Sequence, residues 1–240
     1  MTGCTPDAAP AASTSPSPSS ATGSAEPHAD LARRAASAKD RRYVASYTWT
    51  GTGGKRAVAV TKAGDGSWRI DLPPGVYTNQ GAVSVVGRPE GVYQCGGSGC
   101  VRAARTPGAV PSGSDPQVHH AFTDWLDVLT DRHAAVQVVT AGLEGASGVC
   151  FTVEPTTVAV APPITGATLC FDDSGLLTGV KSKFGTLLLA GPAGEAPGTV
   201  SLPGPLTGGQ PFVTAPVPVA SGQGGGGRTT PRNPPGTTRR

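Results

Sequence analysis

The sequence has few aromatic residues (5%), few charged residues (15%) and no apolar run of 18 or more residues. The missing run excludes a transmembrane helix. A net charge of +3 is too small to predict nucleic-acid binding. The sequence also lacks G-x-S-x-G, H-E-x-x-H and P-loop signatures. We therefore expect a protein that is not an enzyme and that holds no cofactor and no metal.

Glycine (35) and proline (24) are abundant but unevenly spread: residues 201–240 hold 9 Gly and 8 Pro, and residues 5–27 hold 5 Pro. Residues 5–27 are Ser, Thr, Ala, Pro or Gly, except for Asp7 and Glu26. Such a segment buries too little apolar surface to offset its ordering entropy, so we expect a disordered tether. Residues 204–240 are predicted to be a disordered tail. Its arginines offer a weaker alternative, contact with an anionic envelope surface.

The middle of the chain, residues 28–203, predicts one α+β domain. Pro27 at a helix start predicts a helix over 28–42, and Asp115 as N-cap with Pro116 predicts a second helix through Leu129. Runs of alternating polar and apolar residues predict antiparallel strands, which favour a curved sheet with both helices on one face. These strands are expected at 43–50, 56–62, 68–72, 82–86, 91–95, 100–105, 136–140, 149–154, 167–171, 176–183, 184–190 and 199–202.

Four of the five cysteines fall into two plausible pairs. Cys95 and Cys100 flank a Gly-rich turn. Cys150 and Cys170 lie on neighbouring predicted strands, and each stands between two apolar residues, so both sulfurs can point to one face of the sheet while the apolar side chains point to the other. Disulfides Cys95–Cys100 and Cys150–Cys170 are therefore expected, with free thiols as an alternative. A zinc site is disfavoured because only one C-x4-C spacing exists and no histidine is near it. Disulfides imply an oxidising compartment.

The fifth cysteine, Cys4, carries the clearest indication of location. Thr2-Gly3-Cys4 resembles the end of a bacterial lipobox, with Met1 in place of its Leu, and the tether follows directly. The resemblance implies lipidation of Cys4 and anchoring at the extracytoplasmic face of the cell membrane. Residues 1–4 would then be the remnant of a lipobox. The signal peptide would be truncated in this sequence, because the true translation start would lie upstream of Met1. The alternative is a cytosolic protein with a chance cysteine.

The folded part resembles the LolA-like superfamily, in particular the actinobacterial LppX/LprG-type lipoproteins. The stretches that carry this resemblance are 43–50, 68–72, 91–95, Val149-Cys-Phe-Thr-Val153 and Leu169-Cys-Phe-Asp-Asp-Ser-Gly-Leu176. The resemblance implies a half-barrel of antiparallel strands closed by helices, which encloses an apolar cavity for lipid or acyl chains.

That cavity would be lined by large apolar side chains. The resemblance assigns them to Tyr47, Trp49, Trp68, Ile70, Phe122, Trp125, Leu126 and Leu129. Plain core packing is the competing interpretation, because a sheet covered by helices needs large side chains on both faces. The expected function is the binding or carrying of a lipid or acyl ligand by a membrane-anchored lipoprotein. The main alternative is a solid structural or interaction module that contacts an unknown envelope protein. A third alternative is an enzyme whose site the sequence does not reveal.

Two polar motifs are assigned no chemistry. His119 and His120 are adjacent at the start of the predicted second helix, so their side chains should diverge and be solvated, which makes a poor metal pair. Asp172-Asp173-Ser174-Gly175 lacks the spaced ligands of a calcium loop and predicts an ordinary turn.

Overall fold

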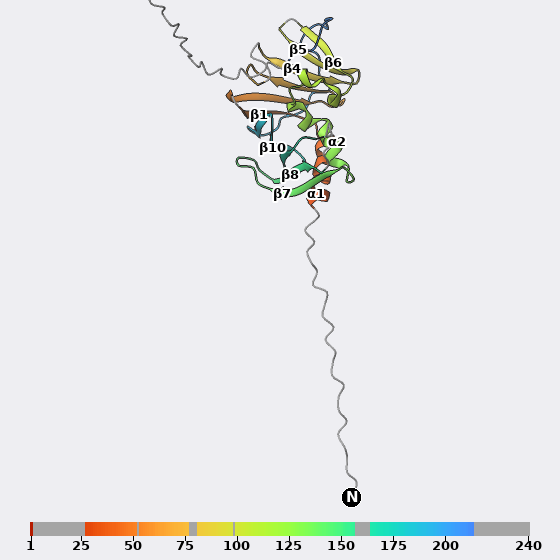
Figure 1. Cartoon of the computed structure of the whole chain (residues 1–240), viewed down its shortest axis with the longest axis vertical. Coiled ribbons are helices and arrows are strands. Elements are labelled where there is room, and N and C mark those ends of the chain that lie inside the picture. The colour runs from red at the N-terminus through yellow and green to blue at the C-terminus, as the bar shows by residue number, and fades with distance from the viewer. Residues whose placement is uncertain (2–26, 52, 77–80, 98, 157–163, 214–240) are drawn as a thin grey trace, which may run out of the picture.

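The computed structural model describes residues 1, 27–51, 53–76, 81–97, 99–156 and 164–213. Cys4, most of the tether and residues 214–240 lie outside this description. Within it, one antiparallel sheet of eleven strands curves around two α-helices and does not close (Figure 1). This is the predicted LolA-like half-barrel of the α+β class.

Along the described chain, one α-helix comes first, and two runs of strands follow that are separated by three 3-10 turns and the second α-helix. The helices are α1 (Pro27–Asp40) and α2 (Asp124–Thr130), with 3-10 turns η1 (Pro107–Ala109), η2 (Ser112–Ser114) and η3 (Val118–Phe122). The first run of strands is β1 (Tyr43–Gly51), β2 (Gly54–Lys62), β3 (Trp68–Leu72), β4 (Val83–Arg88), β5 (Gly91–Gly96) and β6 (Gly99–Ala104). The second is β7 (Val136–Ala141), β8 (Val149–Pro155), β9 (Ala167–Phe171), β10 (Leu177–Ser182) and β11 (Gly185–Leu189).

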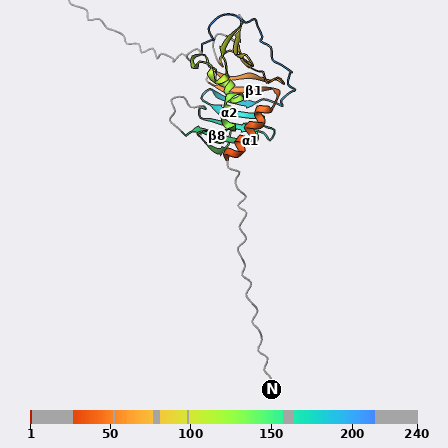
Figure 2. The same ribbon diagram turned by 90° about the vertical axis from the view of Figure 1, so that its right-hand side faces the viewer.

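Each run of strands forms an antiparallel meander, and the two meanders join in the middle of the sheet. The strand order is β6-β5-β4-β3-β2-β1-β11-β10-β9-β8-β7. The junction is the pairing of β1 with β11, from Tyr47 opposite Leu189 to Thr50 opposite Thr186. Both helices lie across the same face of the sheet and contact each other (Figure 2). They therefore bridge the two meanders.

The main core lies between this face and the helices. In β1, Tyr43, Tyr47 and Trp49 are buried, whereas Val44 and Ser46 between them are exposed. This alternation is the period-two pattern expected of a half-buried strand. From the helices, Leu31 of α1 and Leu126 and Leu129 of α2 enter the same core. The sheet and the helices thus share one continuous apolar interior.

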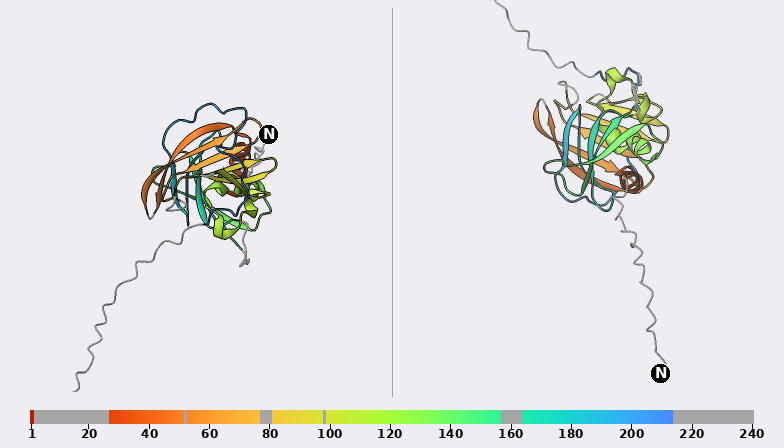
Figure 3. Two further views of the ribbon diagram at one scale, coloured as in Figure 1. Left: turned by 90° about the horizontal axis from the view of Figure 1, so that it is seen from above. Right: turned by 60° about the horizontal axis from the view of Figure 1, so that its bottom comes forward.

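The segment from 190 to 213 runs around the outside of the sheet (blue, Figure 3). A strand was predicted at 199–202, but the segment is not a strand there: the Val200 amide donates to Ser67 Oγ at 2.8 Å. Val200 packs in a second apolar cluster on the opposite face. Further along, the Phe212 amide donates to Gln94 Oε1 at 2.8 Å. Residues 204–213, assigned to the tail by composition, therefore pack against the sheet.

The second helix begins eight residues later than predicted, at Asp124 instead of Pro116. Asp115 does accept a hydrogen bond from the Gln117 amide (2.7 Å), but Gln117 adopts a left-handed conformation with φ 62°. A helix cannot propagate through that conformation, so the chain forms a 3-10 turn, η3, and the α-helix starts at Asp124. Of the described helices, none is long and apolar enough to cross a membrane.

Candidate functional site

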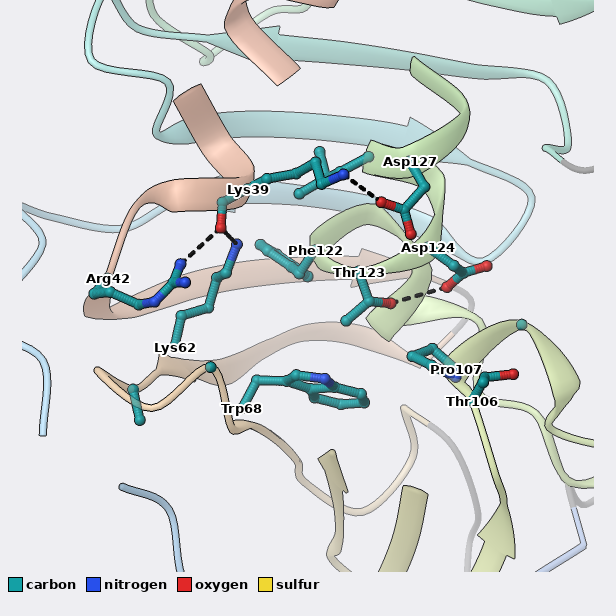
Figure 4. A pocket seen from close by; sticks show the side chains of 14 residues that line it. Lys39, Arg42, Lys62, Trp68, Thr106, Pro107, Phe122, Thr123, Asp124 and Asp127 are labelled. Atoms are coloured by element: carbon teal, nitrogen blue, oxygen red, sulfur yellow. Dashed lines mark hydrogen bonds and ion pairs between the residues drawn. The ribbon is translucent and has the colours of Figure 1, made fainter. Parts of the chain in front are cut away.

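A cavity of about 480 Å³ opens where the end of α1, the β2–β3 turn, η1 and α2 meet (Figure 4). Its volume is within the roughly 300–1,000 Å³ usual for small-molecule sites. Two other hollows, of about 610 and 360 Å³, have no charged side chain in their linings. The first cavity combines aromatic and charged side chains, so it is the candidate site. Its lining is Lys39, Arg42, Lys62, Ala63, Gly66, Trp68, Thr106, Pro107, Gly108, Phe122, Thr123, Asp124, Leu126 and Asp127.

One side of the cavity is apolar. Trp68 comes from the start of β3, Phe122 from the end of η3 and Leu126 from α2. The ring of Phe122 is fixed by an edge-on contact with Tyr47, with the ring centroids 5.3 Å apart. Trp68 is only partly buried, so part of its side chain borders the opening. This side offers a rigid surface for an apolar group.

Beside these rings, the cavity wall carries basic groups at the carboxyl end of α1, and Lys62 is the cross-strand partner of Trp68. Lys62 Nζ donates to the carbonyl oxygens of Ala38 (2.7 Å) and Lys39 (3.4 Å), and Arg42 Nη1 donates to the Lys39 carbonyl (2.6 Å). These bonds satisfy carbonyls that a helix end leaves free, and positive charge is favourable there. Burial, followed by the nearby charge of Arg42, lowers the pKa of Lys62 to about 8. Two cations are thus held at the cavity wall.

An exposed ion pair spans the cavity mouth. Lys39 Nζ lies 2.6 Å from Asp127 Oδ1, with 43% and 68% of the two side chains exposed. Exposed pairs of this kind contribute about 0–1 kcal/mol. An anionic group that entered the cavity could therefore compete for Lys39 at little cost.

Next to the cavity, two histidines and two aspartates form a cluster in which His119 is buried and the other three side chains are half-buried. His120 Nδ1 lies 2.8 and 3.0 Å from the two carboxylate oxygens of Asp124, and His120 Nε2 lies 2.8 Å from Asp115 Oδ2. His119 Nε2 lies 3.4 Å from the Pro107 carbonyl oxygen, and His119 Nδ1 lies 3.7 Å from Asp115 Oδ1. Pro107 and Asp124 also line the cavity, so cluster and cavity share a wall.

The two histidines differ in charge. Burial lowers the pKa of His119 to about 4, and the positive charge of His120 adds to the effect, so His119 is neutral at pH 7. Burial also opposes the charge of His120, but the hydrogen bonds that its ring donates to Asp115 and Asp124 outweigh burial and raise its pKa to about 9. For Asp124, burial opposes the charge, yet its bond to His120 keeps the pKa below its ordinary value. His120 is therefore a cation between two carboxylates.

The expectation that these histidines diverge and are solvated was wrong. His119 is fully buried, and the two ring centroids are 4.2 Å apart with a tilt of 33°. The expectation assumed an α-helix. The left-handed Gln117 and the 3-10 turn after it instead direct both rings toward Asp115. The spacing Asp115, His119, His120 and Asp124 was the sequence signal for this cluster.

The eight residues assigned to a cavity wall divide into two groups. Trp68, Phe122 and Leu126 line the cavity. The other five are buried in the main core, where they fill the space between sheet and helices: Tyr47, Trp49, Ile70, Trp125 and Leu129.

The basic side of the cavity was not predicted from the sequence. A usable signal existed at Lys62, which shares the buried face of β2 with Val58 and Val60. A lysine on the buried, apolar face of a strand is rare unless its charge is paired or functional.

Both predicted disulfides are present. Cys95 is bonded to Cys100, and Cys150 to Cys170, and each pair occupies directly opposed positions on adjacent strands. The predicted lipidation site, Cys4, lies outside the described residues.

Comparison with known proteins adds little to this description. No protein-family model matches the chain, and no curated protein matches it. Among solved structures the chain is similar to "Crystal structure of MucB", with 19% identity and a TM-score of 0.38, over 73% of this chain and 61% of that one. The chain thus spans less than two thirds of that protein's length, and so low a score supports no functional conclusion. Function is therefore inferred from the side chains that form the cavity and its neighbouring cluster.

Proposed function

We propose that this protein is a non-catalytic binding protein for an amphiphile that has an anionic head group and an apolar tail. The observation that carries the proposal is the mixed lining of the 480 Å³ cavity, aromatic at Trp68 and Phe122 and basic at Lys62 and Arg42. An apolar tail would lie against the rings, while the head group would accept hydrogen bonds from the cations. Because most of the space under the helices is filled by core side chains, the ligand would be shallowly inserted rather than fully enclosed.

We also propose that the protein works outside the cytoplasm, anchored to the membrane through lipidated Cys4. The two disulfides support an oxidising compartment. The sequence Thr2-Gly3-Cys4 and the tether after it support the anchor. A lipid ligand is abundant in such a location. Mass spectrometry of the N-terminal peptide from protein isolated from the membrane fraction tests the anchor. An unmodified Cys4 thiol would contradict it.

Titration with laurate, followed by tryptophan fluorescence, tests the binding proposal. Trp68 is the tryptophan that lines the cavity, so Trp68→Phe should abolish the fluorescence response. Lys62→Met should weaken laurate binding about ten- to a hundredfold, since a charge-assisted hydrogen bond contributes roughly 1.5–3 kcal/mol. Lys55→Met, on the exposed start of the same strand, is the matched control and should bind normally. Lauryl alcohol should bind both lysine variants equally.

A different outcome would favour the second candidate function, a solid interaction module of the cell envelope. The observation in its favour is the tightly filled interior, in which Tyr47, Trp49 and Leu129 are fully or almost fully buried. Absence of any laurate response, together with no lipid retained by the full chain in native mass spectrometry, would contradict the amphiphile proposal. Pull-down on an envelope fraction would then be the next measurement.

A further inference from the structure

The His–Asp cluster beside the cavity has the hydrogen-bond arrangement of a metal site. Each histidine directs one ring nitrogen to an acceptor that is not itself a candidate ligand: His120 Nδ1 to the Asp124 carboxylate, and His119 Nε2 to the Pro107 carbonyl. In metal sites, the ligating histidine typically donates its second ring N–H to a carboxylate or a backbone carbonyl. The other two nitrogens, His119 Nδ1 and His120 Nε2, both face Asp115.

His119 Nδ1 gives the second, independent indication. This atom is buried and has no hydrogen-bond partner among the described residues. When Nε2 donates to the Pro107 carbonyl, Nδ1 holds a lone pair instead of a proton. A buried acceptor without a donor costs roughly 1–3 kcal/mol. A cation between His119 Nδ1 and Asp115 would remove that cost.

The spacing of the three candidate ligand atoms suits one ion. The ligating atoms of Asp115, His119 and His120 all lie within 4.8 Å of one another. Tetrahedral ligands about 2.0–2.2 Å from zinc are separated by roughly 3.3–3.6 Å. The observed separations from Asp115 are 2.8 Å to His120 Nε2 and 3.7 Å to His119 Nδ1. These distances run to different oxygens of Asp115, so an ion between them would require Asp115 Oδ2 and His120 Nε2 to move apart by about 0.5 Å.

The surroundings hold these ligands in place. The Trp68 indole stacks on the His119 ring, with an interplanar angle of 9° and centroids 5.8 Å apart. On the other side, His120 stacks on Trp125 at 5.8 Å and 14°. Both imidazoles are therefore fixed before an ion arrives, which reduces the entropy lost on binding.

We propose that Asp115, His119 and His120 bind a divalent transition-metal ion, and that Asp124 is a positioning residue for His120. Two imidazoles and one carboxylate match zinc and its first-row neighbours, whereas calcium and magnesium prefer sites made only of oxygen ligands. On binding, the ion would replace the Nε2 proton that His120 donates to Asp115, and this proton would leave to solvent, while the Nδ1 proton stays on the bond to Asp124. Three protein ligands leave at least one coordination position of the ion open for water.

Titration of the full chain with Zn²⁺ and Co²⁺ tests this site. The protein carries Cys4→Ser, keeps both disulfides and is first treated with a chelator, so that no thiol or residual metal competes. The expected result is one ion per chain, with visible Co²⁺ absorption typical of four or five ligands. His119→Gln and His120→Gln should each weaken binding by more than the roughly 100-fold that outer-shell changes cause. His133→Gln, at an exposed histidine, is the control and should bind normally.

The positioning role of Asp124 has its own matched pair of variants. Asp124→Asn should weaken Zn²⁺ binding about 10–100-fold and change the Co²⁺ spectrum. Asp127→Asn, one helical turn away and paired with Lys39, should change neither. Because His119 is buried, its variant is checked by circular dichroism. If it does not fold, the wild-type readouts decide: a rise in melting temperature with Zn²⁺ and X-ray absorption showing two imidazole nitrogens.

The proposal is overturned by absence of stoichiometric binding to the wild-type chain. It is equally overturned if binding persists unchanged in folded His120→Gln, or if X-ray absorption shows no imidazole ligands. In that case the cluster is a proton-bridged ion pair whose role is to fix η3 against α2.

Discussion

Among single residues, Trp68 has the most consequences for the site, because it borders the cavity and stacks on His119. Its indole lies over Gly87, the residue opposite it on β4. A Cβ atom at Gly87 would stand 2.1 Å from the indole Cε2. Gly87→Ala should therefore displace Trp68, cost about 1–3 kcal/mol and alter the laurate response. Urea unfolding and tryptophan emission measure both effects. Gly142→Ala, where a Cβ meets no atom, should change neither.

Lys62 is a residue whose charge should change between pH 7 and 9.5, because its pKa is about 8. Its folded pKa of about 8 lies below the ordinary value of 10.5, so between these values the unfolded chain binds more protons and stability rises with pH. Relative to Lys62→Met, the wild type should gain about 2 kcal/mol between pH 7 and 9.5. The groups facing Lys62 are Arg42, Asp40 and Lys39. Urea unfolding at both pH values measures the difference. A pH-independent difference would contradict the lowered pKa.

At the scale of elements, strands were predicted better than the second helix. The alternation in Tyr43–Gly51 and the apolar residues around Cys150 and Cys170 are local signals, and the strands formed where they lie. The second helix was misplaced because the Asp115-Pro116 start signal is overridden by Gln117 in a left-handed conformation. Nothing in a glutamine predicts that conformation. The same error hid the His–Asp cluster, which depends on the 3-10 turn.

One buried arginine adds hydrogen bonds to the apolar contacts that attach α1 to the second meander. Arg34 is 6% exposed, donates to the carbonyls of Phe171 (3.4 Å) and Asp172 (3.0 Å) and pairs with Asp173 (3.3 Å). Arg34→Met removes these bonds and should cost about 2–3 kcal/mol in urea unfolding. Arg33→Met is the control on the same helix: its pair with Asp30 is largely exposed on the arginine side, and its loss should cost under about 1 kcal/mol. Equal losses would show that Arg34 does not hold the helix.

At the scale of the whole molecule, the order of the strands was beyond sequence analysis. Each hairpin follows from a local turn, but the pairing of β1 with β11 joins residues about 140 positions apart. No turn or spacing encodes that contact; it forms because both strands complete one sheet beneath the helices. The resemblance supplied the half-barrel architecture. It did not predict how much of the interior is filled by side chains, because that depends on the volumes of all core side chains together.

The two disulfides test whether this joined sheet unfolds as one unit, because each lies within a different meander. Closing the longer loop, with a sequence separation of 20, should stabilise by about 3 kcal/mol, and the shorter one, with a separation of 5, by about 2 kcal/mol. Calorimetry of Cys150→Ala/Cys170→Ala and of Cys95→Ala/Cys100→Ala should show one transition in each case, with the larger drop for the first variant. The β1–β11 pairing and the helices couple the halves, so neither can melt alone. Two separate transitions, one moved by each variant, would mean that the meanders are independent folding units.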